Sequence, residues 1–202
     1  MASNYDPRRS FSLVTPPSAE PLTLAEAKTH LRLETSADDA YVTRLITAAR
    51  VHVEGETRRT LIEQTRRMMV PTFPPGAEPL RLRPLPFLLA VKLSYLADDD
   101  VETDTEIVSP RYGASKDDPW VIPPIGQDWP TDLAEREDAV RVDFKCGYGP
   151  AGTDVPETLR QAMLLVIGSL YENRETEVIG TISSALTFSL DALMERYVVR
   201  RP

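Results

Sequence analysis

The length, composition and charge of the chain exclude several classes of protein. With 202 residues and one cysteine, Cys146, the chain can bury a sizeable core but cannot form an intramolecular disulfide or a cysteine-based zinc site. The formal charge of −8 disfavours a protein whose main role is to coat nucleic acid, and the lack of a long apolar run or a signal peptide predicts a soluble, cytoplasmic protein with no membrane partner.

The N-terminal part of the chain predicts an arm followed by a short helix. Residues 1–20 contain three prolines and no periodicity, so we expect a flexible or extended arm. In PLTLAEAKTHLRL, Thr23 can cap a helix, and Glu26, three positions later, can return the hydrogen bond. Leu24, Ala27 and Leu31 then share one face.

The stretch SADDAYVTRLITAARVHVEGE predicts a second helix. Ser36 is the candidate N-cap, and Gly55 is expected to end the helix. One apolar stripe with helical spacing should face a core. Its residues are Val42, Leu45, Ile46, Ala49 and Val53.

A β-rich region is expected over residues 60–148. TLIEQTRRMMV suits a strand, and residues 105–108 and 120–122 are candidate short strands between Pro-rich and Gly-rich loops. FLLAVKLSYL alternates, which predicts a half-buried strand with one apolar face. That face would carry Phe87, Leu89, Val91, Leu93 and Tyr95.

The stretch VRVDFKCGYG predicts another strand with one buried face. Val140, Val142, Phe144, Cys146 and Tyr148 share one side, and Arg141, Asp143 and Lys145 share the other. Cys146 is therefore expected to pack in the core as a small apolar residue.

A strongly apolar helix is expected over residues 156–175. Its main stripe consists of Leu159, Met163, Val166, Ile167 and Leu170. Ala162, Leu165 and Ser169 widen the apolar surface, and we expect these three residues to contact another subunit. Residues 176–202 then form a C-terminal arm with a short helix.

These elements predict the fold class α+β. A small helical core, residues 21–56 and 156–175, would be interrupted by the β-rich insertion, so that residues 21–175 form a single domain with extended arms at both ends. The 18 prolines argue against an all-helical bundle.

The candidate chemical groups do not form a catalytic set. His30 and His52 lie on separate predicted helices without further ligands at suitable spacing, so they are interpreted as surface residues. Asp98, Asp99 and Asp100 form either a solvated turn or a site for a divalent cation. We therefore expect no enzyme activity, no cofactor and no resident metal.

Two surface features remain open at the level of sequence. The pairs Arg58 with Arg59 and Arg66 with Arg67 either line a face that meets DNA or an acidic partner, or form a solvated strand face. Trp120 and Trp129 lie in a Pro-rich region, where they are either buried beneath a loop or in contact with a partner.

The order of these motifs resembles the head-tail connector, or adaptor, family of tailed bacteriophages, including relatives in prophages and gene transfer particles. The resemblance runs from about residue 21 to residue 175. It is carried by four stretches in this order: PLTLAEAKTHLRLETSADDAYVTRLITAARVHVE, AVKLSYLADDD, VRVDFKCGYG and VPETLRQAMLLVIGSLYENRE.

The resemblance implies a structural protein that joins head to tail. The expected assembly is a ring with twelve-fold symmetry beneath the portal protein, which extends the channel for double-stranded DNA and receives stopper or tail-terminator proteins. The protein would be made in the host cytoplasm and end at the head-tail junction of the particle. Residues 184–202 would dock on the portal. The docking residues would be Leu190, Leu193, Met194, Tyr197, Arg200 and Arg201.

Two alternatives from other classes remain. The first is a small metal-dependent enzyme of nucleic-acid processing that uses Asp98, Asp99, Asp100 and nearby arginines. The second is a stand-alone interaction module that binds its partner as a monomer.

Overall fold

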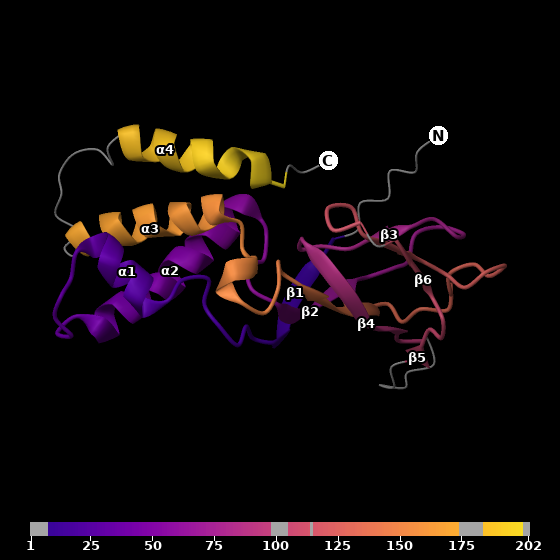
Figure 1. The fold of residues 1–202 in the computed structure, drawn as a ribbon. Helices are drawn as coiled ribbons and strands as arrows, with labels where there is room; N and C mark the ends of the chain where they lie inside the picture. Colours follow the sequence, from indigo (N-terminus) through magenta and orange to yellow (C-terminus); the bar gives the residue numbers. More distant parts are fainter. Residues whose placement is uncertain (1–7, 98–104, 114, 174–183, 200–202) are drawn as a thin grey trace. The chain divides into compact units, whose positions relative to one another are not determined.

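The computed structural model describes residues 8–97, 105–113, 115–173 and 184–199, the last range without the side chains of residues 184–188. The contacts divide the chain into two compact units. A sheet unit comprises Met1–Pro16 and Gln64–Gly147, and a helical unit comprises Pro17–Glu63 and Tyr148–Pro202. Helices and antiparallel sheets occur together, so the predicted α+β class is confirmed (Figure 1). None of the described helices is long and apolar enough to cross a bilayer.

The helical unit contains the described α-helices. In chain order its elements are α1 (Leu24–Leu31), α2 (Asp39–Thr57), the 3-10 helix η1 (Gly152–Asp154), α3 (Glu157–Glu172), α4 (Ser184–Met194) and the 3-10 helix η2 (Glu195–Tyr197). The predicted apolar stripe of α2 is buried in full. It packs in one core with the stripe of α3, from which Leu170 is the exposed exception.

Helix α1 begins at the predicted cap. The Thr23 hydroxyl oxygen accepts a hydrogen bond from the Glu26 backbone N–H at 3.2 Å, and a Glu26 carboxylate oxygen accepts one from the Thr23 backbone N–H at 2.7 Å. Two backbone donors that the helix leaves unpaired are thereby satisfied. Ala27 is buried, with Leu24 and Leu31 packed against the same core.

The ends of α2 differ from the prediction. The N-cap is Asp38 and not Ser36, and its side chain makes no capping hydrogen bond. The helix continues past Gly55 to Thr57, whose buried hydroxyl donates a hydrogen bond to the Val53 carbonyl at 2.6 Å. Arg58 then ends the helix in the left-handed conformation, with φ 54°.

The sheet unit contains one large and one small antiparallel sheet. The large sheet has the order β1-β2-β8-β4-β5 and the small sheet has the order β3-β7-β6. The strands are β1 (Ser10–Thr15), β2 (Gln64–Val70), β3 (Leu80–Arg81), β4 (Phe87–Tyr95), β5 (Thr105–Glu106), β6 (Arg111–Gly113), β7 (Trp120–Ile122) and β8 (Val140–Cys146). Strand β1 lies within the segment expected to be an arm.

Strand β8 is the centre of the large sheet and has the predicted alternation. Val140, Val142, Phe144 and Cys146 are fully buried. They align with β2 on one side, where Met68 pairs with Val142, and with β4 on the other. The core that they form includes Trp129, which stacks on Phe73 at 4.5 Å between ring centroids. For Trp129, burial beneath the loop is therefore the correct alternative.

The predicted apolar face of β4 is wrong at its centre. The pairing of β4 with β8 shifts its register twice, between Phe87 and Leu89 and again between Ala90 and Lys92. Each irregularity moves the following side chain to the opposite face of the strand. Leu89 and Val91 are consequently 60% and 55% exposed, whereas Phe87 and Leu93 are buried.

Candidate assembly surfaces

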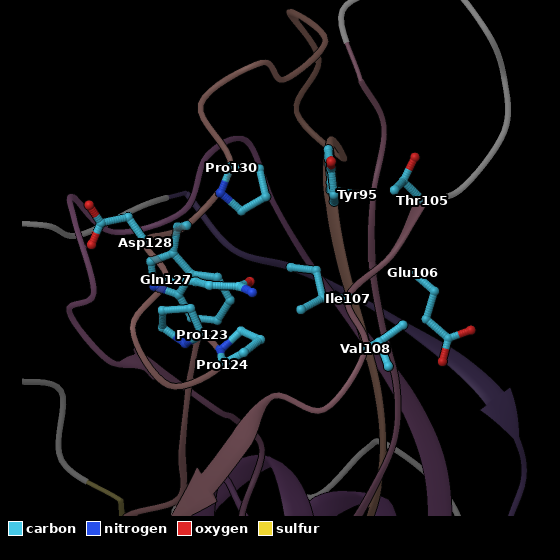
Figure 2. A pocket seen from close by; sticks show the side chains of 11 residues that line it. Tyr95, Thr105, Glu106, Ile107, Val108, Pro123, Pro124, Gln127, Asp128 and Pro130 are labelled. Carbon is cyan, nitrogen blue, oxygen red and sulfur yellow. The ribbon is translucent and has the colours of Figure 1, made fainter.

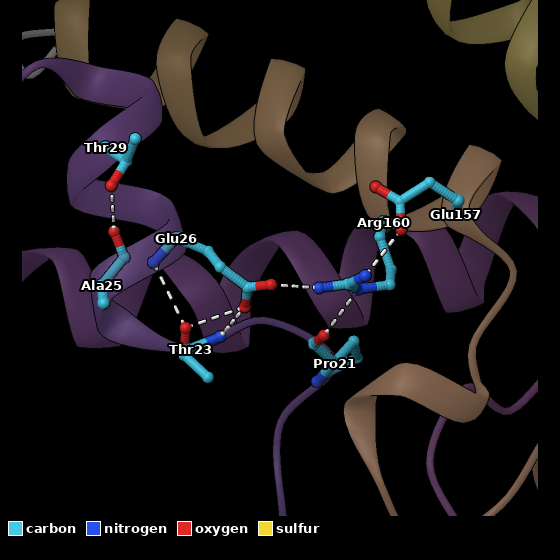
Figure 3. A network of polar contacts seen from close by, with 7 residues as sticks. All are labelled: Pro21, Thr23, Ala25, Glu26, Thr29, Glu157 and Arg160. Carbon is cyan, nitrogen blue, oxygen red and sulfur yellow. Dashed lines mark hydrogen bonds and ion pairs between the residues drawn. The ribbon is translucent and has the colours of Figure 1, made fainter.

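An ion-pair network ties the start of α1 to α3 within the helical unit (Figure 3). The Arg160 guanidinium donates to the Pro21 carbonyl at 3.1 Å, to a Glu157 carboxylate oxygen at 2.6 Å and to the second carboxylate oxygen of Glu26. Glu26 thus caps α1 with one oxygen and receives Arg160 with the other. The sequence analysis found the cap but not Arg160, because 134 residues separate Glu26 from this partner.

The electrostatics of Glu26 follow from this position. Hydrogen bonding from the Thr23 backbone N–H holds the pKa of the Glu26 carboxyl below its ordinary value of 4.5, and the nearby Arg160 charge acts in the same direction. Partial burial opposes both effects. The network therefore favours the ionised carboxylate and holds the chain entering α1 at a defined place on α3.

The predicted docking segment packs against the helical unit of its own chain. Met194 is buried in the helical core, and Leu190, Leu193 and Tyr197 are partly buried against it. Beyond α4, the Val199 backbone N–H donates to the Thr57 carbonyl at 3.0 Å. Arg200 and Arg201 lie outside the described residues.

Two of the four arginines considered for a DNA or partner face bind this C-terminal segment. Arg59 donates to the Tyr197 carbonyl at 2.6 Å, and Arg58 donates to the Val199 carbonyl at 3.4 Å. Both side chains thereby satisfy carbonyl oxygens that follow the last helical turn. No local sequence signal predicts these contacts, because about 140 residues separate the partners.

The other two predicted arginines belong to the sheet unit. Arg67 makes a two-pronged ion pair with Asp143 on the neighbouring strand β8, with N···O distances of 2.7 and 2.8 Å. Arg66, the next residue of β2, has its Cα opposite Phe144. Since Arg58 and Arg59 lie in the helical unit, the four arginines do not form one continuous strand face.

The three residues predicted for a subunit interface differ in burial. Ala162 is fully buried in the core of its own helical unit, so it has no surface to offer to a neighbouring copy. Leu165 and Ser169 are half-buried and remain available at the edge of α3. Of the three predicted interface residues, Leu165 and Ser169 therefore stay candidates for contact with another subunit, whereas Ala162 belongs to the core.

The sheet unit has a hollow of about 280 Å³ at the end of β4 (Figure 2). It is lined by Tyr95, Ile107, Val108, the buried Trp129 and prolines from the loop after β7. Figure 2 shows the carboxylates of Glu106 and Asp128 on opposite sides of this hollow. The polar side chains among its lining residues are Tyr95, Thr105, Glu106, Gln127 and Asp128.

The described residues contain no group of three or more His, Cys, Asp or Glu side chains that could hold a metal ion. His30 and His52 are both exposed, on α1 and α2. Asp98, Asp99 and Asp100, the carboxylates of the enzyme alternative, lie outside the described residues.

Comparisons with known proteins find similarity in both the helical unit and the sheet unit. A sequence model of the family described as "Phage gp6-like head-tail connector protein" matches residues 21–94. The chain is similar to a chain in a structure of the "neck of empty GTA particle computed with C6 symmetry", with 26% identity and a TM-score of 0.78 over 96% of this chain and 97% of that chain.

Two further solved structures resemble the chain. A chain of the virion of a native gene transfer agent (GTA) particle is 26% identical, with a TM-score of 0.74 over 95% of this chain and 96% of that chain. A chain in the neck of a native GTA particle computed with C12 symmetry is 24% identical, with a TM-score of 0.70 over 96% of this chain and 97% of that chain. No curated protein matches the sequence.

Proposed function

We propose, from the premise that this chain is a phage head-tail connector protein, that it forms a ring in the neck of a tailed-phage or gene transfer particle. Twelve copies would surround the channel for double-stranded DNA, with the portal protein on one side and stopper or tail-terminator proteins on the other. The connector family is structural and not enzymatic, so we assign no reaction to the chain.

One observation carries this proposal. The likeness to a chain of a particle neck extends over 96% of this chain at 26% identity, so it includes the sheet unit and the helical unit alike. A shared helical hairpin alone would not give a likeness of this extent. The six-fold symmetry of that neck supports a ring whose number of copies is a multiple of six, and twelve agrees with the resemblance seen in the sequence.

We further propose that the C-terminal segment mediates contact with the portal. The buried Met194 and the backbone hydrogen bond between Val199 and Thr57 hold this segment on the helical unit. Only its solvent-exposed residues can therefore contact the portal without unfolding of the segment. Asp191 and Arg196 are exposed there, and Arg200 and Arg201 follow directly in the sequence. Deleting residues 184–202 would uncover the core as well, so point substitutions are the cleaner test.

The first experiment is to add the purified chain to tailless, DNA-filled heads and to image the portal vertex by electron microscopy. We expect an added ring of density at that vertex. A vertex without added density, together with a monomeric chain in solution, would contradict the connector ring and favour the interaction-module alternative.

The second experiment tests the docking segment on the same heads. We expect the double variant Arg200→Ala, Arg201→Ala to leave fewer heads with a ring, because two cationic contacts are lost. The exposed Arg44→Ala, on α2, is the matched control and should bind as the unmodified chain does. Equal ring occupancy for the double variant and the control would contradict the docking assignment.

A further inference from the structure

The large sheet of the sheet unit ends in two open edges. Strand β1 pairs with β2 on one side and has no strand on its other side among the residues that the structure describes. At the opposite edge, β5 pairs with β4 only at Ser94 and Tyr95. Within the described ranges, no strand covers the outer side of β4 at residues 88–91.

Both open edges carry exposed apolar side chains. On β1, Phe11, Leu13 and Val14 are 42%, 52% and 46% exposed. On β4, the exposed apolar residues are Leu89 and Val91. Half of the large apolar side chains exposed on the described part of the chain lie on these two edges, which makes them the main apolar surfaces of the sheet unit. Such surfaces on a folded protein are characteristic of contact sites.

The sequence of β1 lacks the usual protection of an edge strand. Natural edge strands are kept from pairing by lysines, prolines, inward-pointing charges or β-bulges. The six residues SFSLVT contain no lysine, proline or charge, and the prolines Pro16 and Pro17 follow only after the strand has ended. The register of β1 shifts only between Leu13 and Thr15, at the end of the strand, whereas residues 10–13 pair regularly with β2. The edge is therefore competent to add another strand by backbone hydrogen bonding.

The ring proposed above identifies the strand that would be added. A closed ring of identical copies needs two different, complementary surfaces on each copy. The edges of β1 and β4 meet this requirement because they lie at opposite ends of one sheet. Three successive antiparallel pairings, β1 with β2, β2 with β8 and β8 with β4, also make β1 run opposite to β4.

We propose that β1 of one copy pairs antiparallel with residues 88–91 of β4 in the next copy, so that the large sheets join edge to edge around the ring. This inference rests on the proposed ring and adds the contact that closes it. The apolar side chains of the two edges would then shield one another from water, and the backbone groups of both edges would gain partners. Since β1 carries no charged side chain, no charge is desolvated on its side of the contact.

The test uses disulfide formation in rings assembled on tailless heads. A disulfide requires the two Cα atoms to lie roughly 4.4 to 6.8 Å apart, so it reports neighbouring strands directly. The natural Cys146 is buried and leaves introduced cysteines as the reactive thiols. We would combine Leu13→Cys with Leu89→Cys in one variant and with Val91→Cys in another, which tests two neighbouring registers.

We expect oxidation to give a ladder of covalently linked copies in at least one of these two variants. The control variant, Val51→Cys with Ile125→Cys, pairs two exposed apolar positions away from the edges and should give no ladder. A complementary variant, Leu13→Lys, should reduce the fraction of heads with a ring by about tenfold or more, because it places a charge in an apolar contact. The exposed Val51→Lys should leave that fraction unchanged.

The outcomes separate this inference from the proposed function. If rings form on heads but neither cysteine variant gives a ladder and Leu13→Lys is tolerated, the edge pairing is wrong while the connector ring stands. Cross-links from Leu13→Cys to the portal or to another particle protein would likewise overturn the pairing between copies. If the unmodified chain forms no ring on heads, the proposed ring fails, and the edge pairing fails with it.

Discussion

Replacing Arg160 tests whether the network around Glu26 holds the helical unit together. Arg160→Met keeps the stem of the side chain and removes its three polar contacts. The loss leaves the carbonyl of the buried Pro21 without this donor, which costs about 1 to 3 kcal/mol. The ion pair with Glu26 adds at most about 1 kcal/mol, since that side chain is 41% exposed. We expect a total loss of about 2 kcal/mol in the free energy of unfolding.

The assay for Arg160→Met is urea unfolding followed by two signals. Far-ultraviolet circular dichroism follows the α-helices, which lie in the helical unit among the described residues, whereas both tryptophans, Trp120 and Trp129, belong to the sheet unit. A loss of about 2 kcal/mol lowers the dichroism midpoint by roughly 1 M urea. The control is Glu157→Gln, which removes an exposed contact of the same arginine and should cost less than about 0.5 kcal/mol.

Either of two results would refute this reasoning. An unchanged dichroism midpoint for Arg160→Met would mean that water replaces the guanidinium at the Pro21 carbonyl. An equal loss for Arg160→Met and Glu157→Gln would mean that the exposed i,i+3 pair, and not the contact with the start of α1, carries the stabilisation.

Three further predictions concern single side chains. The folded pKa of Glu26 lies below 4.5, so the unfolded chain binds more protons just below that pH, and the free energy of unfolding should fall as the pH drops from 4.5 through the folded pKa. Glu26→Gln should weaken this dependence of stability on pH in urea titrations, and an unchanged dependence would contradict the prediction. In Gly113→Ala, the new Cβ would clash with the indole of Trp120, so we expect a shifted tryptophan emission spectrum, whereas an unaltered spectrum would show that the site adapts freely. Leu165→Asp should block ring assembly or folding, because α3 is apolar around this half-buried position, and rings formed by a stably folded variant would show that this face is solvated.

Local patterns predicted the elements whose determinants lie close together in the sequence. The cap of α1 depends on two residues three positions apart, and the stripe of α2 depends on helical spacing alone, so Thr23, Glu26 and Val42 behave as predicted. The alternation of β8 also holds, because this strand lies between two paired neighbours without irregularity on its β2 side. In each case the local preference and the tertiary environment agree.

The failures occur where distant segments determine the structure. Leu89 and Val91 are exposed because two register shifts against β8 reverse the alternation of β4, and a regular strand pattern does not reveal such shifts. Phe11 and Leu13 lie in a segment without clear periodicity, because β1 forms only by pairing with the edge of β2, more than fifty residues later. For Arg58 and Arg59 the sequence left open a DNA or partner face and a solvated strand face, and it did not indicate their contacts with carbonyls near the opposite end of the sequence.

The two units interleave along the chain, and this order constrains the synthesis of the protein. Strand β1 leaves the ribosome first but must wait for β2, and helices α1 and α2 must wait for α3, which follows the whole of the inserted sheet unit. Neither unit is thus a continuous segment that a single cut would release or that a simple gene fusion would transfer. The helical core is complete only after the sheet strands have been made. A nascent chain therefore exposes the apolar stripe of α2, a surface of the kind that chaperones bind, until late in translation.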